Sequence, residues 1–217
     1  CTTSANATAG FSMIYHATDG YYGGTYGHGL GKTPAFMVTR DVDNVNQWYV
    51  WHQSYGNQTH DYALLNTYGA VTTGGSASWA SPSSSTVLLD LGLTRKGITY
   101  VWAEIEGFSK FGTYTGNGST DGPFVHLGFR PALVILKGSE NNYGWLMFDN
   151  KRDPDNHVYL TLNSTSTAAD YSHEAMNFLS NGFKLKSSSD GNSYNKSGQT
   201  LYYAAWAESP FKYARAR

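Results

Sequence analysis

The sequence predicts an all-β protein, an antiparallel β-sandwich or jelly roll built from two internal repeats of about 97 residues. Three observations lead to this fold class. Aromatic residues make up 15% of the 217 residues and 24 residues are glycine, a composition that suits short strands and tight turns. Short apolar runs are separated by turn signals, and no segment carries a convincing apolar stripe at helical spacing. The second half of the chain also repeats the first.

The repeat is visible as matching residues at a constant distance along the chain. The pairs 97 positions apart are Gly10-Phe-Ser with Gly107-Phe-Ser, Pro34-Ala with Pro131-Ala, and His60-x-Tyr with His157-x-Tyr. A constant offset over this length means that nothing is inserted or deleted, which chance rarely produces. Near the end of each copy Trp102 recurs as Trp206, 104 positions later, so the second copy carries a short insertion.

These offsets place the first copy at residues 10–106 and the second at 107–217, after an N-terminal stub at residues 1–9. One copy is small for an independent hydrophobic core. We therefore expect both copies to pack into one double-layer domain, with two tandem sandwiches as the alternative.

Strands are expected wherever a short apolar run follows a turn signal. The two copies carry matching runs of this kind, at 35–39 and 48–51 in the first copy and at 132–136 and 145–148 in the second. These runs are apolar on both faces, which predicts strands that are buried on both sides.

A further strand is predicted at residues 100–106, where the side chains alternate. Val101, Ala103 and Ile105 fall on one face, and the aromatic and acidic side chains fall on the other. The one helix that the sequence suggests is short, around residues 168–178.

The charge balance excludes two classes of partner. Lysine plus arginine number 15 against 16 for aspartate plus glutamate, and charged residues make up only 14% of the chain. Nucleic acid and anionic membranes are bound through clustered basic charge, which this balance does not provide. The apolar runs are also too short to cross a bilayer as helices. The one cysteine, Cys1, allows no intrachain disulfide.

Three motifs of the second copy carry a resemblance to a known family. They are Gly107-Phe-Ser-Lys-Phe-Gly-Thr-Tyr-Thr-Gly-Asn-Gly118, Asp121-Gly-Pro-Phe-Val125 and Gly128-Phe-Arg-Pro-Ala132. They resemble a duplicated C-terminal module of unknown function found in tail-fibre-like and other virion surface proteins of marine phages. That module is itself regarded as similar to concanavalin A-like lectin sandwiches.

The resemblance implies a non-enzymatic recognition or adhesion module at the virion surface, as the distal head of a tail fibre. Such a head would be a homotrimer, would bind a glycan or protein of the host surface, and would contact other virion proteins. Two alternatives stay open: a structural decoration protein of a virion or surface filament, and a glycan-degrading, tailspike-like hydrolase. The Cys1 start, followed by a polar segment, also allows a bacterial cell-surface lipoprotein.

Aromatic residues are the candidates for ligand contact, because sugar rings stack on them. The matched tryptophans Trp48 with Trp145 and Trp102 with Trp206 are expected to anchor the core of each copy. The candidates for ligand binding are then Trp51, Trp79, Tyr21, Tyr22 and Tyr114.

A catalytic alternative rests on two carboxylates. Glu104 and Glu106 stand two positions apart on the predicted strand, so both would point the same way, about 6–7 Å apart. Retaining glycosidases hold their carboxyl pair about 5–5.5 Å apart. Two solvated carboxylates near a strand end are the plainer interpretation, and we expect no enzymatic activity.

A calcium site is the one cofactor that the sequence suggests. Asp149, Asp153 and Asp155 lie in a short loop rich in oxygen ligands, and Ca²⁺ takes about six to eight of these. The spacing is not that of an EF-hand, and an Asp/Asn/Pro turn paired with Lys151 and Arg152 is the alternative.

Overall fold

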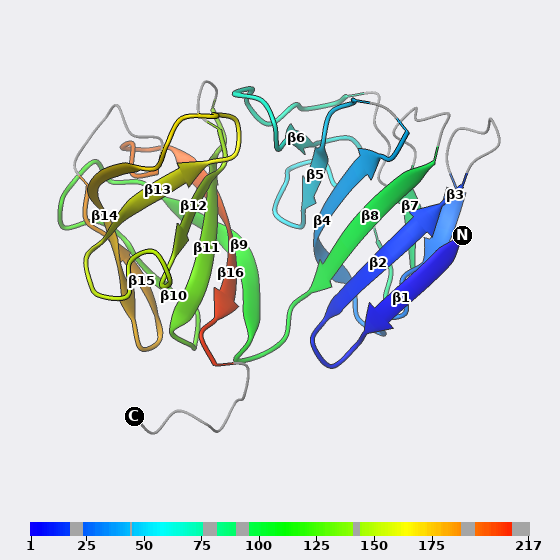
Figure 1. Cartoon of the computed structure of the whole chain (residues 1–217), viewed down its shortest axis with the longest axis horizontal. Coiled ribbons are helices and arrows are strands. Elements are labelled where there is room, and N and C mark those ends of the chain that lie inside the picture. Colours follow the sequence, from blue (N-terminus) through cyan, green and yellow to red (C-terminus); the bar gives the residue numbers. More distant parts are fainter. Residues whose placement is uncertain are drawn as a thin grey trace. The chain divides into compact units, whose positions relative to one another are not determined.

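The computed structural model describes residues 1–17, 24–43, 45–75, 82–89, 96–140, 144–187 and 194–209 (Figure 1). These residues form strands, turns and loops, and no helix, so the all-β fold class is confirmed. In particular, the described part of the chain contains no helix long and apolar enough to cross a membrane.

The chain divides into two compact units, Cys1–Asn66 with Val71–Ile105 (unit 1) and Thr67–Ala70 with Glu106–Arg217 (unit 2). Buried apolar side chains form a separate cluster in each unit. The duplication itself remains an inference from the sequence, as does the packing of both copies into one double-layer domain.

The described residues of unit 1 form eight strands. Their bounds are β1 Thr2–Asn6, β2 Phe11–His16, β3 Gly24–Gly27, β4 Pro34–Asp41, β5 Tyr49–His52, β6 Ala63–Leu64, β7 Thr86–Leu89 and β8 Gly97–Ala103. Six of them form an antiparallel sheet in the order β1-β2-β8-β4-β5-β6, and β3 pairs with β7 in a small second sheet. The stub at residues 1–9 therefore contributes a strand to the large sheet.

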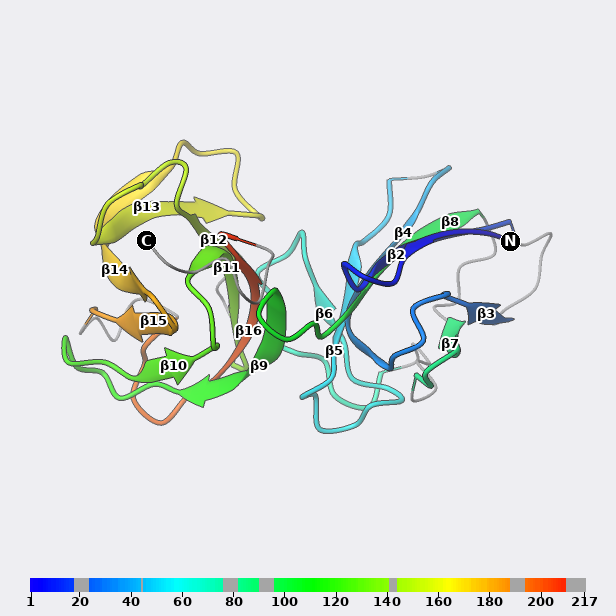
Figure 2. The ribbon, with the colours of Figure 1, turned by 90° about the horizontal axis from the view of Figure 1, so that it is seen from below.

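The core of unit 1 lies between these two sheets (Figure 2). The large sheet contributes Ile14, Met37 and Val101, and the small sheet contributes Val87 and Leu89. Strand β8 alternates as predicted, with Val101 and Ala103 buried and Tyr100 and Trp102 half-buried on the opposite face. It ends at Ala103, however, and not at Glu106.

In unit 2, the part of the chain that the structure describes also forms eight strands. Their bounds are β9 Ser109–Thr115, β10 Phe124–His126, β11 Pro131–Gly138, β12 Leu146–Asp149, β13 Val158–Asn163, β14 Tyr171–Leu179, β15 Gly182–Leu185 and β16 Thr200–Ala207. All belong to one sheet in the order β10-β15-β14-β13-β12-β11-β16-β9.

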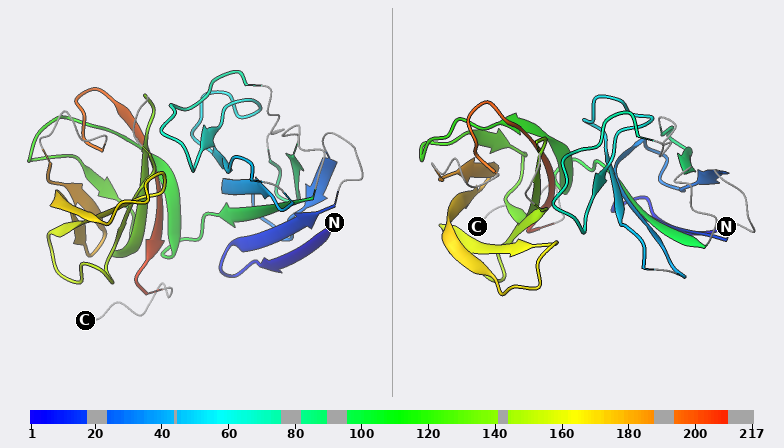
Figure 3. Two further views of the ribbon diagram at one scale, coloured as in Figure 1. Left: turned by 45° about the horizontal axis from the view of Figure 1, so that its top comes forward. Right: turned by 90° about the horizontal axis from the view of Figure 1, so that it is seen from above.

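The sheet of unit 2 curls around its own core (Figures 2 and 3). Its two edge strands are linked by Lys110 of β9, whose Nζ donates a hydrogen bond of 2.9 Å to the carbonyl oxygen of His126 in β10. Phe148, Phe178 and Phe183 are among the large side chains that fill the interior. The sandwich architecture is thus reached by curvature of a single sheet in this unit.

The predicted helix around residues 168–178 is wrong. Tyr171–Leu179 is strand β14, which pairs with β13 and β15. Ala175, Met176 and Phe178 of this strand are buried in the core. Pairing on both sides and burial of these side chains outweigh the local helix preference of Ala, Met and Glu.

The Tyr-Thr-Gly-Asn-Gly motif of the second copy has a structural role. The hydroxyl of Tyr114 donates a hydrogen bond of 2.5 Å to the carbonyl oxygen of Tyr194. The amide of Asn117 donates to the side-chain oxygen of Asn195, 3.0 Å away. Gly116 lies so close to this segment that a Cβ would clash with the carbonyl oxygen of Lys196. The motif therefore fastens the turn after β9 to residues 194–196.

Substitution Gly116→Ala is expected to destabilise the protein by about 1–3 kcal/mol, because backbone atoms on both sides of the contact must move apart. Urea denaturation followed by tryptophan fluorescence measures the change. Gly56→Ala is the control, since its added Cβ would meet only ordinary contact with Asp61 at 3.6 Å. Equal stability of the two variants would contradict the close approach at Gly116.

Candidate functional site

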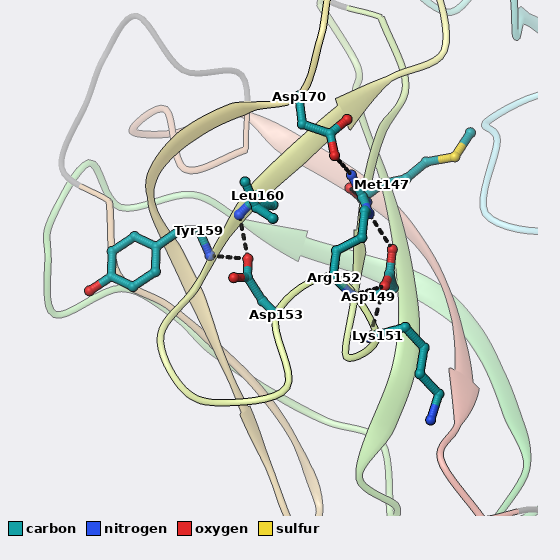
Figure 4. Close-up of polar contacts among 8 residues, drawn as sticks. All are labelled: Met147, Asp149, Lys151, Arg152, Asp153, Tyr159, Leu160 and Asp170. Atoms are coloured by element: carbon teal, nitrogen blue, oxygen red, sulfur yellow. Dashed lines mark hydrogen bonds and ion pairs between the residues drawn. The ribbon is translucent and has the colours of Figure 1, made fainter.

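The acidic loop between β12 and β13 is held together by its own side chains and backbone (Figure 4). Asp149 accepts hydrogen bonds from the amides of Lys151 and Arg152, both at 2.9 Å, and from Nε of Arg152 at 2.7 Å. Arg152 also donates to Asp170 at 2.8 Å and to the carbonyl oxygen of Met147 at 3.1 Å. Its guanidinium therefore bridges β12 and the segment that leads into β14.

This network changes the electrostatics of both partners. Partial burial would by itself raise the pKa of Asp149, but the hydrogen bonds from Arg152 and Lys151 and the charge of Arg152 outweigh it and lower the pKa. Burial would likewise lower the pKa of Arg152, and the two aspartates raise it instead. Both groups are thus held in their charged forms.

The structure engages two of the three predicted calcium ligands of this loop, Asp149 and Asp153, in other contacts, and the calcium site stays a prediction. Asp153 uses one carboxylate oxygen to accept hydrogen bonds from the amides of Tyr159 at 2.7 Å and Leu160 at 2.5 Å (Figure 4). Asp155 is exposed. No three acidic, histidine or cysteine side chains gather as a metal site within the described residues. The turn paired with Arg152, which was the alternative, describes the loop.

The two candidate catalytic carboxylates do not share a strand face. Because β8 ends at Ala103, Glu104 and Glu106 lie beyond it in a connecting segment. Glu104 belongs to unit 1, where its carboxylate accepts a hydrogen bond of 3.2 Å from Gln53, whereas Glu106 begins unit 2. The alternation on which the pair was predicted therefore ends before it reaches either carboxylate.

The structure moves two of the aromatic candidates into the core. Trp51 is 1% exposed, and its Nε1 donates a hydrogen bond of 3.0 Å to the carbonyl oxygen of Gln58. Tyr114 is 8% exposed. Neither can contact a ligand without disrupting the fold. The other three candidates, Trp79, Tyr21 and Tyr22, lie outside the described residues.

The four tryptophans that were predicted to anchor the core differ in their burial. Trp145 is fully buried, as expected. Trp48, Trp102 and Trp206 are only half-buried. Trp102 lies on the face of β8 that points away from the core, so its assignment as a core anchor is wrong.

Trp102 belongs to a row of rings that crosses four strands of the large sheet of unit 1. Phe11 of β2, Trp102 of β8, Phe36 of β4 and His52 of β5 stand opposite one another in the strand register. Successive ring centroids are 5.1, 5.6 and 6.1 Å apart. Contacts of this length between cross-strand neighbours stabilise the sheet.

Two further rows continue this outer face toward the other end of β2. Met13 stands opposite Tyr100, and Tyr15 stands opposite Ile98. Met13 and Tyr15 are each 37% exposed, which is high for apolar side chains in the middle of a strand. None of the outward side chains of β2 and β8 is charged. We define these outward residues of β2 and β8 as the aromatic face; they are Phe11, Met13, Tyr15, Ile98, Tyr100 and Trp102.

One buried titratable group lies elsewhere, in unit 2. Lys137 of β11 is 1% exposed, and its Nζ donates a hydrogen bond of 2.7 Å to the carbonyl oxygen of Gly69. Gly69 lies in Thr67–Ala70, the short segment that clusters with unit 2. Burial lowers the pKa of Lys137 to about 8, because the charged form loses its hydration.

Comparison with known protein families identifies the family of this chain. The model of the family described as a domain of unknown function (DUF7483) matches residues 1–210. The chain belongs to the DUF7483 family. No curated protein and no solved structure matches it. The DUF7483 match covers both units, so the motif that fastens the turn after β9 and the aromatic face both lie within the family's domain.

The Asp149 network of this DUF7483 chain makes its stability sensitive to acid. A carboxylate whose pKa is lowered by folding stabilises the protein above its unfolded pKa, and this stabilisation is lost as the pH falls through the folded pKa. We expect Asp149→Asn to cost about 2 kcal/mol near pH 7 and progressively less as the pH falls below the ordinary aspartate range. Urea denaturation across this pH range tests this, with exposed Asp155→Asn as the neutral control. If the free energies of unfolding of the wild type and Asp149→Asn differed by the same amount at all pH values, the lowered pKa of Asp149 would be contradicted.

The contribution of Lys137 to stability also rises with pH, but over a higher pH interval than that of Asp149. Because folding lowers its pKa, the folded protein carries the cost of a buried charge below about pH 8, and the cost disappears between about pH 8 and 10.5. The free energy of unfolding of the wild type, relative to Lys137→Met, should rise by about 3 kcal/mol over this interval. Lys196→Met, at a surface ion pair, is the control. A difference that is independent of pH would contradict the lowered pKa.

Proposed function

We propose that this DUF7483 chain is a non-enzymatic recognition module that binds a neutral glycan on the aromatic face of unit 1. The observation that carries the proposal is the pair of cross-strand rows in which exposed Met13 and Tyr15 stand opposite half-buried Tyr100 and Ile98. The resemblance to tail-fibre-like proteins of marine phages supports a place on a virion, where the glycan would belong to the host surface.

The chemistry of the aromatic face favours a carbohydrate. Sugar rings present apolar C–H faces and hydroxyl groups together, and tyrosine and tryptophan match both through an apolar ring and a polar tip. The face is built on strands of a paired sheet, so its side chains are held in place before binding and little conformational entropy is lost.

The lack of charge on the aromatic face favours a neutral glycan over an acidic one. Within the aromatic face, a sulfated or uronic-acid polymer would have to be desolvated against side chains that offer no counter-charge. A neutral polymer meets no such cost. The neighbouring Arg40 of β4, opposite Ile98, has its guanidinium over the Trp48 ring, 4.7 Å from the ring centroid. Binding at a single face of this kind is weak, and presentation of several copies on one particle strengthens it by raising the effective concentration.

Tyr15→Ala is expected to reduce retention on a neutral host polysaccharide about tenfold, because the substitution removes the most exposed ring of the face. Retention of labelled protein on isolated polysaccharides measures the effect. Tyr159→Ala is a matched control, since Tyr159 is 39% exposed but lies on β13 of unit 2. Both variants should keep the melting temperature of the wild type within a few degrees.

The same retention experiment, with released reducing ends measured alongside, distinguishes the other functions. Release of reducing ends by the wild type would show a hydrolase and overturn the non-enzymatic proposal, and Glu104→Gln would be the first variant to examine. Equal losses for Tyr15→Ala and Tyr159→Ala would overturn the placement of the site. No retention on any host polysaccharide or intact host cell would favour a structural decoration protein.

A further inference from the structure

Strand β1 lies at the edge of the large sheet of unit 1, and its outer side has no partner strand in the part of the chain that the structure describes. Its five residues, Thr-Thr-Ser-Ala-Asn, are all exposed. They pair with β2 in a continuous register, Thr2 with Tyr15 through to Asn6 with Phe11, without a bulge. The free side of β1 is therefore a regular row of backbone donors and acceptors.

Edge strands of soluble proteins are usually protected against pairing with other chains. They are very short, carry a charge or a proline, contain a bulge, or are covered. The other edges of the two large sheets follow this rule. Strand β6 has two residues, β10 has three, and β9 carries Lys110, which links it to β10. Strand β1 has five residues and none of these devices.

We propose that β1 pairs in antiparallel fashion with β1 of a second copy of this chain, about a two-fold axis at Ser4. In this register all five residues are paired: Ser4 faces the partner's Ser4, Thr3 faces the partner's Ala5, and Thr2 faces the partner's Asn6. Every pair joins small, uncharged side chains, so no charge is opposed by a like charge and no bulky group blocks the approach. The strand is thus complementary to itself, as a two-fold contact requires.

The pairing joins two six-stranded sheets into one. Residues directly opposite in an antiparallel pair point to the same face, so the aromatic faces of both copies come to lie on the same side of the joined sheet. The contact is isologous and closes at two copies. It therefore differs from the homotrimer that the resemblance to tail fibres implies, and the number of copies in the assembly separates the two.

The proposal is tested by introducing a positive or a negative charge at the two-fold axis. Sedimentation equilibrium of the wild type at increasing concentration should approach the mass of two chains. Ser4→Lys and Ser4→Glu should each remain monomeric, because like charges then face each other across the axis. An equimolar mixture of the two variants should recover the dimer at least as strongly as the wild type. Ser4 is exposed, so both variants are expected to fold, which circular dichroism verifies.

Oxidative cross-linking gives an independent readout of the register. Cα atoms of facing residues in an antiparallel pair lie about 4.5–5.5 Å apart, within the range of a disulfide. In a Cys1→Ser background, Ser4→Cys should form a covalent dimer, whereas Ser172→Cys, an exposed position on β14 of unit 2, should not. A wild type that stays monomeric at millimolar concentration, a mass of three chains, or no recovery in the mixture of charge variants would overturn the proposal.

Discussion

The register of β8 is the constraint on which unit 1 depends. This strand lies between β2 and β4 and pairs with both, although β2 and β4 are far from it in the sequence. A shift by one residue would turn Val101 and Ala103 outward and bring Tyr100 and Trp102 into the core. The buried alternation of β8 thus determines at once which side chains fill the core and which remain on the aromatic face.

The sequence predicts the fold class and the alternation of side chains along β8 because both depend on local pattern. Alternation at period two and frequent turn signals are properties of neighbouring residues, and they identify strands without knowledge of their partners. The helix expected around residues 168–178 fails for the complementary reason. Pairing of this segment with β13 and β15 and burial of Met176 and Phe178 stabilise it as a strand by more than its local helix preference would stabilise a helix.

Local sequence cannot assign the role of a side chain that suits both a ligand and a contact within the fold. The carboxylates of Asp149 and Asp153 suit a metal ion equally well, but the fold engages them with backbone amides and with Arg152. The aromatic face was missed because both faces of the sheet carry apolar residues, while the core side of β2 includes the polar Ser12 and His16. Composition alone could not tell which face is buried, and so Trp51 and Trp102 were each assigned to the wrong side.

Both large sheets share one feature of chain order: the last strand of each unit is inserted between two earlier ones, β8 between β2 and β4 and β16 between β9 and β11. On the ribosome, β2 and β4 emerge tens of residues before the strand that joins them. Until residue 103 leaves the exit tunnel, each exposes an edge that can pair with neighbouring nascent chains. We therefore expect translation rate and chaperone access over this interval to affect the yield of native protein, and a fragment that ends before Gly97 would lack the strand that joins β2 to β4.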